Sequence, residues 1–306
     1  MAKHLLNSAW TQAGLTKKNK GNTPMPNYKK VVLTGASGTI AGLVLPALRA
    51  QYDLTLLDVR NTDRQGNEIP DIHIADLTDD NRDAYRHHFQ SADAIVHMAF
   101  VGSPNPKQGF APELANVAMA YNIYQTALEE SVSRVVVASS NHAADYYEPL
   151  ILARQRDTID PEERALSDNY YGWAKESYEH LGFVFAVGRV NGRPLENIQV
   201  RIGGPRETDV DRCAPGDLTC VRRALGAYIS QRDLSQLIIK SIETTDIRDK
   251  EGVAFQIFYG ISGNDHAFWS LVNARKVVGY APEDNSAVRF SAQVAQHMQK
   301  AQEDAQ

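Results

Sequence analysis

The sequence predicts an α/β fold of the Rossmann type, a doubly wound parallel sheet with helices on both faces. Short apolar runs alternate with helical stretches between Lys29 and Gly203, which is the pattern of a parallel α/β sheet. The runs are apolar at nearly every position, as expected for strands buried on both faces. A glycine-rich turn also follows the first run and opens the first helix, as in dinucleotide-binding sheets.

The expected elements follow in chain order. Strands are predicted at 31–33, 54–57, 72–74, 94–97, 134–138, 199–202 and 255–259. Helices are predicted at 40–50, near 116–130, around 171–175, near 234–242 and after residue 270. We therefore divide the chain into a flexible extension (1–28), a cofactor-binding domain that also carries the catalytic residues (29–203) and a smaller substrate-binding part (204–306).

Composition and charge narrow the class of protein. The 306 residues are 43% apolar and 23% charged, the balance of an ordinary globular protein. The net charge of −5 comes from acids and bases mixed along the chain, so the basic face of a nucleic-acid binder is missing. No apolar run has the length that crosses a membrane. We expect a cytoplasmic enzyme that acts on a small molecule.

The chain has only two cysteines, Cys213 and Cys220. Their spacing allows a disulfide, but in a cytosolic protein two reduced thiols are the expected state. No second Cys or His pair stands at ligand spacing, so no metal site is predicted.

The glycine turn predicts a dinucleotide cofactor. Its spacing is Gly-x-x-Gly-x-x-Ala, in which Gly35 permits the tight turn and Gly38 lets the backbone approach a pyrophosphate. The helix that follows offers free N–H groups to the phosphates. Asp58 ends the next strand about 20 positions later and is placed to accept hydrogen bonds from the adenosine ribose. Asp58 would repel a 2′-phosphate, so NAD is favoured over NADP; the nearby Arg60 keeps NADP as an alternative.

Later strand ends are expected to reach the same cofactor. Asp76 and Leu77 follow the third strand and would lie against the adenine, while residues 98–100 follow the fourth. From these patterns the expected cofactor contacts are Gly35, Ser37, Gly38, Thr39, Ile40, Asp58, Asp76, Leu77, Met98, Ala99 and Phe100.

The catalytic candidates are Tyr171 and Lys175, a Tyr-x-x-x-Lys pair on one helix face. A phenol with a reference pKa near ~10 is a poor base at neutral pH, and an adjacent ammonium favours its phenolate. Such a pair also arises by chance in helices. Here, however, the fifth strand ends in Ser139-Ser140-Asn141-His142, and strand ends in this architecture point towards the ligand.

Together these motifs resemble the extended short-chain dehydrogenase/reductase family, over nearly everything from Lys29 to Phe290. The segment from Asn116 to Asn122 is similar to a family pattern in which the first Asn meets the cofactor and the second is structural. The resemblance thus adds Asn116, Tyr171 and Lys175 to the cofactor contacts. It also implies a homo-oligomer, a dimer or larger, built from exposed helices.

A narrower resemblance is to bacterial uronate dehydrogenases and archaeal NAD-dependent glucose-6-phosphate dehydrogenases. It rests on residues 138–142, 200–203 and 259–265. The likeness implies that Ser140, Asn141 and His142 hold the sugar. It places the substrate carboxylate on Arg223, with Arg222 and Arg212 as competitors, and adds a weaker match at Ser103.

The resemblance implies NAD-dependent oxidation of the anomeric carbon of a small acidic sugar to a lactone. Ser140, Tyr171 and Lys175 would be the catalytic residues, and the small-molecule partner besides NAD would be a sugar acid or sugar phosphate. Three alternatives remain open. They are a glucose 6-phosphate dehydrogenase, a nucleotide-sugar epimerase or dehydratase, and a non-catalytic NAD-binding regulatory protein.

Overall fold

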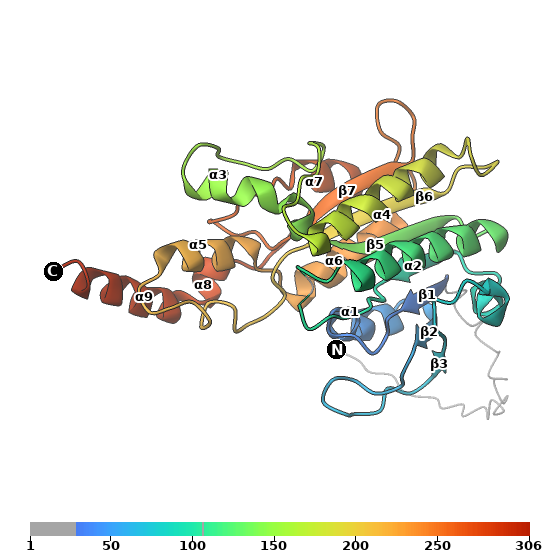
Figure 1. The fold of residues 1–306 in the computed structure, drawn as a ribbon, viewed down its shortest axis with the longest axis horizontal. Helices are drawn as coiled ribbons and strands as arrows, with labels where there is room; N and C mark the ends of the chain where they lie inside the picture. Colours follow the sequence, from blue (N-terminus) through green and yellow to red (C-terminus); the bar gives the residue numbers. More distant parts are fainter. Residues whose placement is uncertain (1–28, 106) are drawn as a thin grey trace, which may run out of the picture.

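The computed structural model describes residues 29–105 and 107–306, in which seven strands form one parallel sheet (Figure 1). The strand order is β3-β2-β1-β4-β5-β6-β7, which confirms the predicted doubly wound class. The extension predicted at 1–28 lies outside the described residues. The strands are β1 (Lys30–Thr34), β2 (Asp53–Asp58), β3 (Ile72–Ile74), β4 (Ala94–His97), β5 (Arg134–Ser140), β6 (Glu196–Ile202) and β7 (Phe255–Gly260).

Helices cover both faces of this sheet (Figure 1). The α-helices are α1 (Thr39–Arg49), α2 (Phe110–Glu129), α3 (Glu148–Leu152), α4 (Tyr170–Val187), α5 (Leu218–Ala227), α6 (Gln231–Glu243), α7 (Val272–Val278), α8 (Ser286–Arg289) and α9 (Ser291–Glu303). Short 3-10 helices are η1 (Arg82–Ala84), η2 (Arg86–Phe89) and η3 (Asn141–Tyr147). In the described part of the chain, no helix is long and apolar enough to cross a lipid bilayer.

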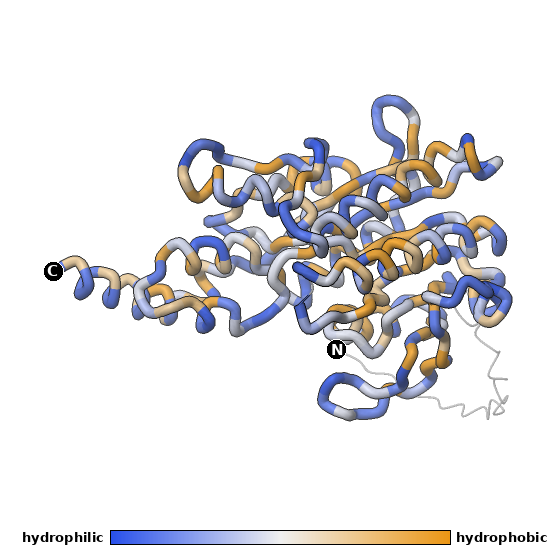
Figure 2. The backbone as a smooth tube through the Cα atoms, in the orientation of Figure 1, coloured by the Kyte–Doolittle hydropathy of each residue, from blue (hydrophilic) through white to orange (hydrophobic). Residues whose placement is uncertain are grey.

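Two hydrophobic cores lie on opposite faces of the sheet. In β1, Val31 and Leu33 pack with α1 and α6 on one face. Val32 packs with α2 and α4 on the other. This alternation follows from the two-residue period of a strand. Hydrophobic residues accordingly concentrate along the central strands and the helix sides that face them, whereas most loops are hydrophilic (Figure 2).

Two elements extend further than the sequence predicts. α2 begins at Phe110 rather than near Asn116, because the proline at position 112 is tolerated in the first turn of a helix. β6 begins at Glu196 rather than Gln199. Its inward amides interrupt the apolar pattern, and the Gln199 Nε2 donates to the buried Tyr124 hydroxyl at 2.8 Å and to Asn197 Oδ1 at 2.6 Å.

The region after β6 corrects two predictions. It contains a helix, α5, where the sequence predicted only a polar segment; Asp217 caps it by accepting from the Cys220 N–H at 3.0 Å. The predicted free thiols are wrong, because Cys213 and Cys220 form a disulfide. The capped turn brings their Cα atoms to 5.6 Å, within the range a disulfide needs. Together α5, α8 and α9 lie at one end of the molecule, around a small core of their own (Figure 1).

Candidate active site

The turn between β1 and α1 is shaped for close approach to a ligand. Gly35 has a positive φ of 69°, and a Cβ there would lie 2.5 Å from the Ala99 backbone nitrogen, so only glycine fits. Gly38 is the N-cap of α1 and provides no side-chain cap. The first N–H groups of α1, which begins with the predicted Thr39 and Ile40, are therefore left to an anionic partner.

Asp58 ends β2 beside this turn. One carboxylate oxygen accepts from the Ser37 backbone N–H at 2.9 Å and from the Ser37 hydroxyl at 2.8 Å. Arg60 also donates to the Ser37 hydroxyl, at 3.1 Å. Asp58, the acid predicted to bind the adenosine ribose, thus lies at the glycine turn. Arg60, the residue that keeps NADP as an alternative cofactor, lies next to it.

α2 carries the two asparagines, Asn116 and Asn122, for which different roles were predicted, and the structure confirms the role of Asn122. Asn122 is structural, because its side-chain amide donates to the backbone carbonyls of Leu77 and Asp79. Asn116 bonds both backbone groups of Val101, at 2.7 and 3.2 Å. It therefore fixes the loop after β4; its predicted contact with the cofactor remains a prediction.

The Tyr-x-x-x-Lys pair lies over the carboxyl ends of β4 and β5. Lys175 Nζ lies 5.2 Å from the Tyr171 ring centroid and 5.1 Å from that of Phe100. Lys175 donates to the Ala138 carbonyl of β5 at 3.1 Å. Gly172 allows α4 to pack closely here, because a Cβ at this position would lie 2.1 Å from the His142 carbonyl oxygen. α4 and the segment after β5 therefore approach as closely as backbone allows.

Burial and charge shift the ionisation of this pair. Burial raises the pKa of Tyr171, while a hydrogen bond from Ser140 acts in the opposite direction. Burial lowers the pKa of Lys175 to about 8, opposed by the carboxylates of Glu113 and Glu179. The hydrogen bond from Ser140 is therefore the main interaction that favours the Tyr171 phenolate against the cost of burial.

The Ser-Asn-His motif sits beside the tyrosine. Ser140 is buried at the end of β5 and accepts from the His142 N–H at 3.3 Å. Asn141 is 2% exposed, and its Nδ2 has no partner among the described residues. Because a buried amide N–H is costly to leave unpaired, this donor is available to a bound molecule.

The sequence reasoning missed the residues that orient this motif. Asp145 accepts from His142 Nδ1 at 2.8 Å and from the side-chain amide of Asn169 at 3.0 Å. Asn169 caps α4 by accepting from the Gly172 N–H at 3.0 Å. Asp145 thereby connects the histidine to the start of α4, and the His142 ring lies 5.5 Å from the Tyr171 ring. The three-residue spacing of His142 and Asp145 was the available signal.

The predicted carboxylate anchor, Arg223, lies on α5 and already has an acidic partner. Its Nε and Nη2 donate to the two oxygens of Glu148, at 3.1 and 3.0 Å. Its guanidinium also lies 5.8 Å from the centroid of the Trp269 ring system. This fork geometry is the one arginine uses for carboxylates.

For two other predicted substrate contacts, Arg212 and Ser103, the structure shows only contacts with residues close in sequence. Arg212 is exposed and pairs with Asp209 at 3.2 Å. The Ser103 hydroxyl accepts from the Asn105 N–H within its own loop. A different arginine, Arg206, lies close enough to Tyr171 for its charge to favour the phenolate; no sequence pattern singled it out.

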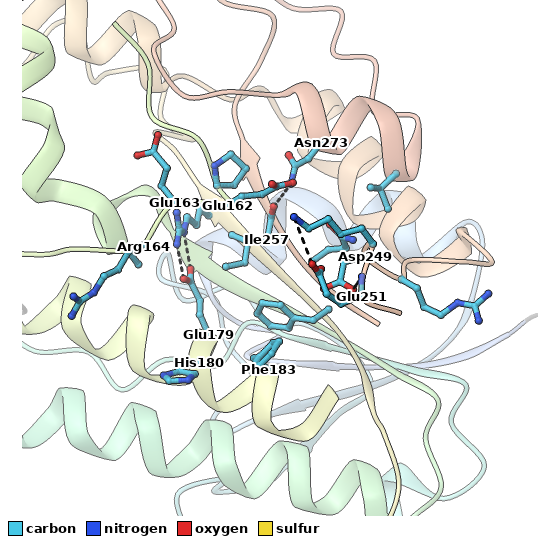
Figure 3. A pocket seen from close by; sticks show the side chains of 18 of the residues that line it. Glu162, Glu163, Arg164, Glu179, His180, Phe183, Asp249, Glu251, Ile257 and Asn273 are labelled. Atoms are coloured by element: carbon cyan, nitrogen blue, oxygen red, sulfur yellow. Dashed lines mark hydrogen bonds and ion pairs between the residues drawn. The ribbon is translucent and has the colours of Figure 1, made fainter. Parts of the chain in front are cut away.

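A cavity of about 880 Å³ lies elsewhere, between α4, β7 and α7 (Figure 3). Glu179 and Phe183 line it from α4, and Ile257 and Asn273 from the far side. Its inner wall includes the buried ion pair between Glu179 and Arg201, at 2.8 Å. None of the predicted catalytic residues lines this cavity.

Comparisons with known proteins place the chain among NAD-dependent enzymes of the same fold. The model of the NAD dependent epimerase/dehydratase family matches residues 31–186. A uronate dehydrogenase of Pseudomonas syringae pv. tomato is 28% identical, with 89% of this chain and 88% of that protein covered. An L-arabinose 1-dehydrogenase (NAD(P)(+)) of Haloferax volcanii is 30% identical, covering 84% of this chain and 98% of the relative. A solved structure of a mutated uronate dehydrogenase matches with a TM-score of 0.69 at 26% identity, covering 88% of this chain and 86% of that one.

Proposed function

The chain belongs to the NAD dependent epimerase/dehydratase family, and we propose that it oxidises the anomeric carbon of a hexuronate to a lactone. At the coarser level it is an NAD-dependent sugar dehydrogenase. The observation that carries the proposal is the group formed by Ser140, Tyr171 and Lys175, with the His142 ring 5.5 Å from the tyrosine. This set suits the removal of a hydroxyl proton.

The residues of the glycine turn fit NAD. The uncapped start of α1 and the absence of a side chain at Gly35 suit a pyrophosphate. Asp58 suits an unphosphorylated ribose. When bound, NAD supplies the acceptor for the hydride that leaves the anomeric carbon.

The protein's own residues handle the proton. We place the anomeric hydroxyl against Ser140 and Tyr171, so that the Tyr171 phenolate accepts its proton. Lys175 stabilises the phenolate by its charge, and the Ala138 carbonyl holds that ammonium in place at 3.1 Å. The unpaired Nδ2 of Asn141 and the Asp145-oriented ring of His142 are available to the other hydroxyls of the sugar.

Arg223 is the proposed site of the substrate carboxylate. It already shows that a carboxylate fits it, because Glu148 occupies its fork. A uronate would displace Glu148 or share the guanidinium with it.

A second candidate is a neutral sugar oxidised at the same carbon. The occupied fork of Arg223 favours it, since a sugar without a carboxylate has no need to displace Glu148. The arabinose-named relative is the matching comparison.

The test is NAD reduction by the purified protein, followed at the NADH absorbance. D-glucuronate, D-galacturonate, glucose 6-phosphate, L-arabinose and glucose are compared in parallel by kcat/KM. The proposal expects a uronate to lead by at least about tenfold, the value of one charge-assisted hydrogen-bond pair. A lead for L-arabinose favours the neutral sugar, and bound NAD that no sugar consumes favours an epimerase.

We further propose that the protein assembles through α2 and α4. Both helices expose large apolar side chains, which soluble monomers rarely group together. They are Phe110, Leu114, Tyr121, Tyr170 and Phe183. Light scattering during size-exclusion chromatography tests the assembly, and a monomer at all concentrations would refute it.

A further inference from the structure

A group of buried polar side chains beneath α4 plays no part in the mechanism proposed above. Ser139 Oγ donates to Glu179 Oε1 at 2.5 Å. Arg201 Nε and Nη2 donate to the two oxygens of Glu179, at 2.9 and 2.8 Å, and Arg201 Nη1 donates to the Tyr259 hydroxyl at 3.0 Å. These four side chains, the α4 anchor, join α4 to β5, β6 and β7.

Burial alone does not explain the polar residue at position 139. Val135 and Val137 of the same strand pack in the core on the sheet face that α2 and α4 cover. Because a strand repeats its faces every two residues, position 139 continues that face. The side chains of Ser139, Glu179 and Arg201 are all buried there. A buried ion pair stabilises a fold little more than apolar packing would, but its hydrogen bonds permit only one arrangement of the elements it joins.

On β5, Ser139 lies between the two residues that contact the catalytic pair. The carbonyl of Ala138 accepts from Lys175 Nζ at 3.1 Å, and the side chain of Ser140 hydrogen-bonds to Tyr171. A shift of α4 along the strand would therefore change both contacts at once. The hydrogen bond from Ser139, made at the position between them, opposes such a shift.

On α4, Glu179 lies on the helix face that carries the catalytic pair. It follows Lys175 by four residues and Tyr171 by eight, spacings that bring side chains to the same side of a helix. Its two oxygens accept from Ser139 and from the Arg201 guanidinium. Holding Glu179 in place therefore also fixes the register in which Lys175 and Tyr171 meet β5.

We propose that Ser139 is a positioning residue of the active site, whose hydrogen bond to Glu179 holds α4 in its catalytic register on β5. In that register Tyr171 and Lys175 lie against Ser140. The proposal rests on the function proposed above, since it assigns those three residues to the reaction. The Ser139 hydroxyl donates to Glu179 and acts only through the helix. Because misplacing a catalytic group by about 1 Å costs up to roughly 10²-fold in rate, a loosened helix lowers kcat.

The first variant is Ser139→Ala, which removes the hydroxyl but leaves Glu179 paired with Arg201, so that the buried charges stay compensated. We expect kcat for the preferred sugar to fall by about tenfold. KM for the sugar and Kd for NADH should change by less than about twofold, because no contact with either ligand is removed. Ser139→Thr keeps the hydroxyl on a side chain that strands favour, and is expected to restore most of kcat.

The matched control is Ser262→Ala, which removes a similar hydrogen bond outside the α4 anchor. Ser262 Oγ donates to Asp233 Oδ2 at 2.6 Å, and both residues are 0% exposed. This bond joins the segment after β7 to α6. Ser262→Ala is expected to lower the free energy of unfolding about as much as Ser139→Ala does, yet to keep the wild-type kcat. A purely structural role of Ser139 would instead make the two variants alike in kcat.

Hydrogen exchange of backbone amides, followed by mass spectrometry, reports the anchoring itself. In Ser139→Ala, exchange in α4 is expected to be about fivefold faster than in wild type, the value of one hydrogen bond. Ser262→Ala should leave exchange in α4 unchanged. The proposal is overturned by unchanged exchange in α4 of Ser139→Ala, by a near wild-type kcat in that variant, or by an equal fall of kcat in Ser262→Ala.

The exchange measurement also separates this proposal from the proposed function, because it uses no sugar and no NAD. Faster exchange in α4 of a Ser139→Ala protein, when even the wild type oxidises no sugar, would refute the proposed function. It would leave the anchoring of α4 by Ser139 standing.

Discussion

The glycine turn after β1 and the arginine group on α5 (Arg223 with its partner Glu148) position their functional groups in different ways. At the turn, the positions are set mainly by contacts with the backbone. Only glycine fits at position 35 because a Cβ would collide with the Ala99 backbone, and Asp58 accepts from the Ser37 backbone N–H of the same turn. On α5, Arg223 is held by Glu148, which lies 75 positions away in sequence. The first arrangement is local and the second depends on the whole fold.

The two regions should therefore differ in how well they tolerate amino-acid substitutions. A turn built from backbone constrains the class of cofactor and tolerates few substitutions. A side-chain pair such as Arg223 and Glu148 can be altered at either partner without rebuilding the fold. We therefore expect variants near the turn and the catalytic helix to abolish or redirect the chemistry. Variants in the arginine group should change mainly the choice and affinity of the sugar.

The largest effect is expected from Tyr171→Phe. Without the phenol no group accepts the proton, so kcat falls by about 10²- to 10⁴-fold, the range of general-base catalysis. NADH binding, measured by fluorescence, should be retained. The matched control is Tyr170→Phe, because Tyr170 is exposed beside it. A Tyr171→Phe protein with near wild-type kcat would refute the catalytic assignment.

The next effect concerns the cofactor. Asp58→Asn removes the charge that repels a 2′-phosphate while Arg60 stays in place beside Ser37. We expect the preference for NAD over NADP to fall by roughly 10- to 100-fold, the value of a charged hydrogen bond. Kinetics with each cofactor measure it. Asp53→Asn, at the exposed start of the same strand, is the control, and an unchanged preference in Asp58→Asn would exclude this role.

A smaller effect is expected in the arginine group. Glu148→Gln removes the carboxylate that competes for Arg223, so KM for a uronate should fall by about threefold to tenfold, while kcat changes little. Arg223→Lys should raise the same KM. Glu207→Gln, whose partners are Tyr228 and Arg289, serves as the control. If KM for the uronate rises in Glu148→Gln, the pair is structural and the carboxylate binds elsewhere.

The smallest effect on catalysis is expected from the disulfide. Cys213 and Cys220 join the start of α5 to the loop before it, far in sequence from the catalytic helix. Cys213→Ser should lower the free energy of unfolding of this part by about 2–3 kcal/mol, the loop-closure value for so short a ring. Urea unfolding measures it, and kcat should be unchanged. Equal stability with and without a reducing agent would contradict the linkage.

The same comparison explains how far the sequence could predict the molecule. The order of strands and helices and the positions of Gly35, Asp58, Tyr171 and Lys175 follow from local patterns, and the structure places them as expected. Glycine spacing and strand ends carry this information because neighbours in sequence determine the geometry.

What escaped prediction depends on residues distant in sequence. Glu148 and Arg223 meet only in the folded chain. The helix α5 was missed because it is short and follows a polar segment, and its apolar residues pack in a small separate core with α8 and α9. Buried charges carry no periodic signal, and their partners are recognised only in space.

The most direct test of the central claim follows the hydrogen on the anomeric carbon. D-galacturonate and D-glucuronate carrying deuterium at C1 are incubated with the protein and NAD, and the products are examined by NMR and mass spectrometry. The account predicts one deuterium at C4 of the NADH nicotinamide for each lactone formed, with slower turnover than for the unlabelled sugar. NADH without deuterium, or a changed sugar with no NADH, would contradict oxidation at the anomeric carbon.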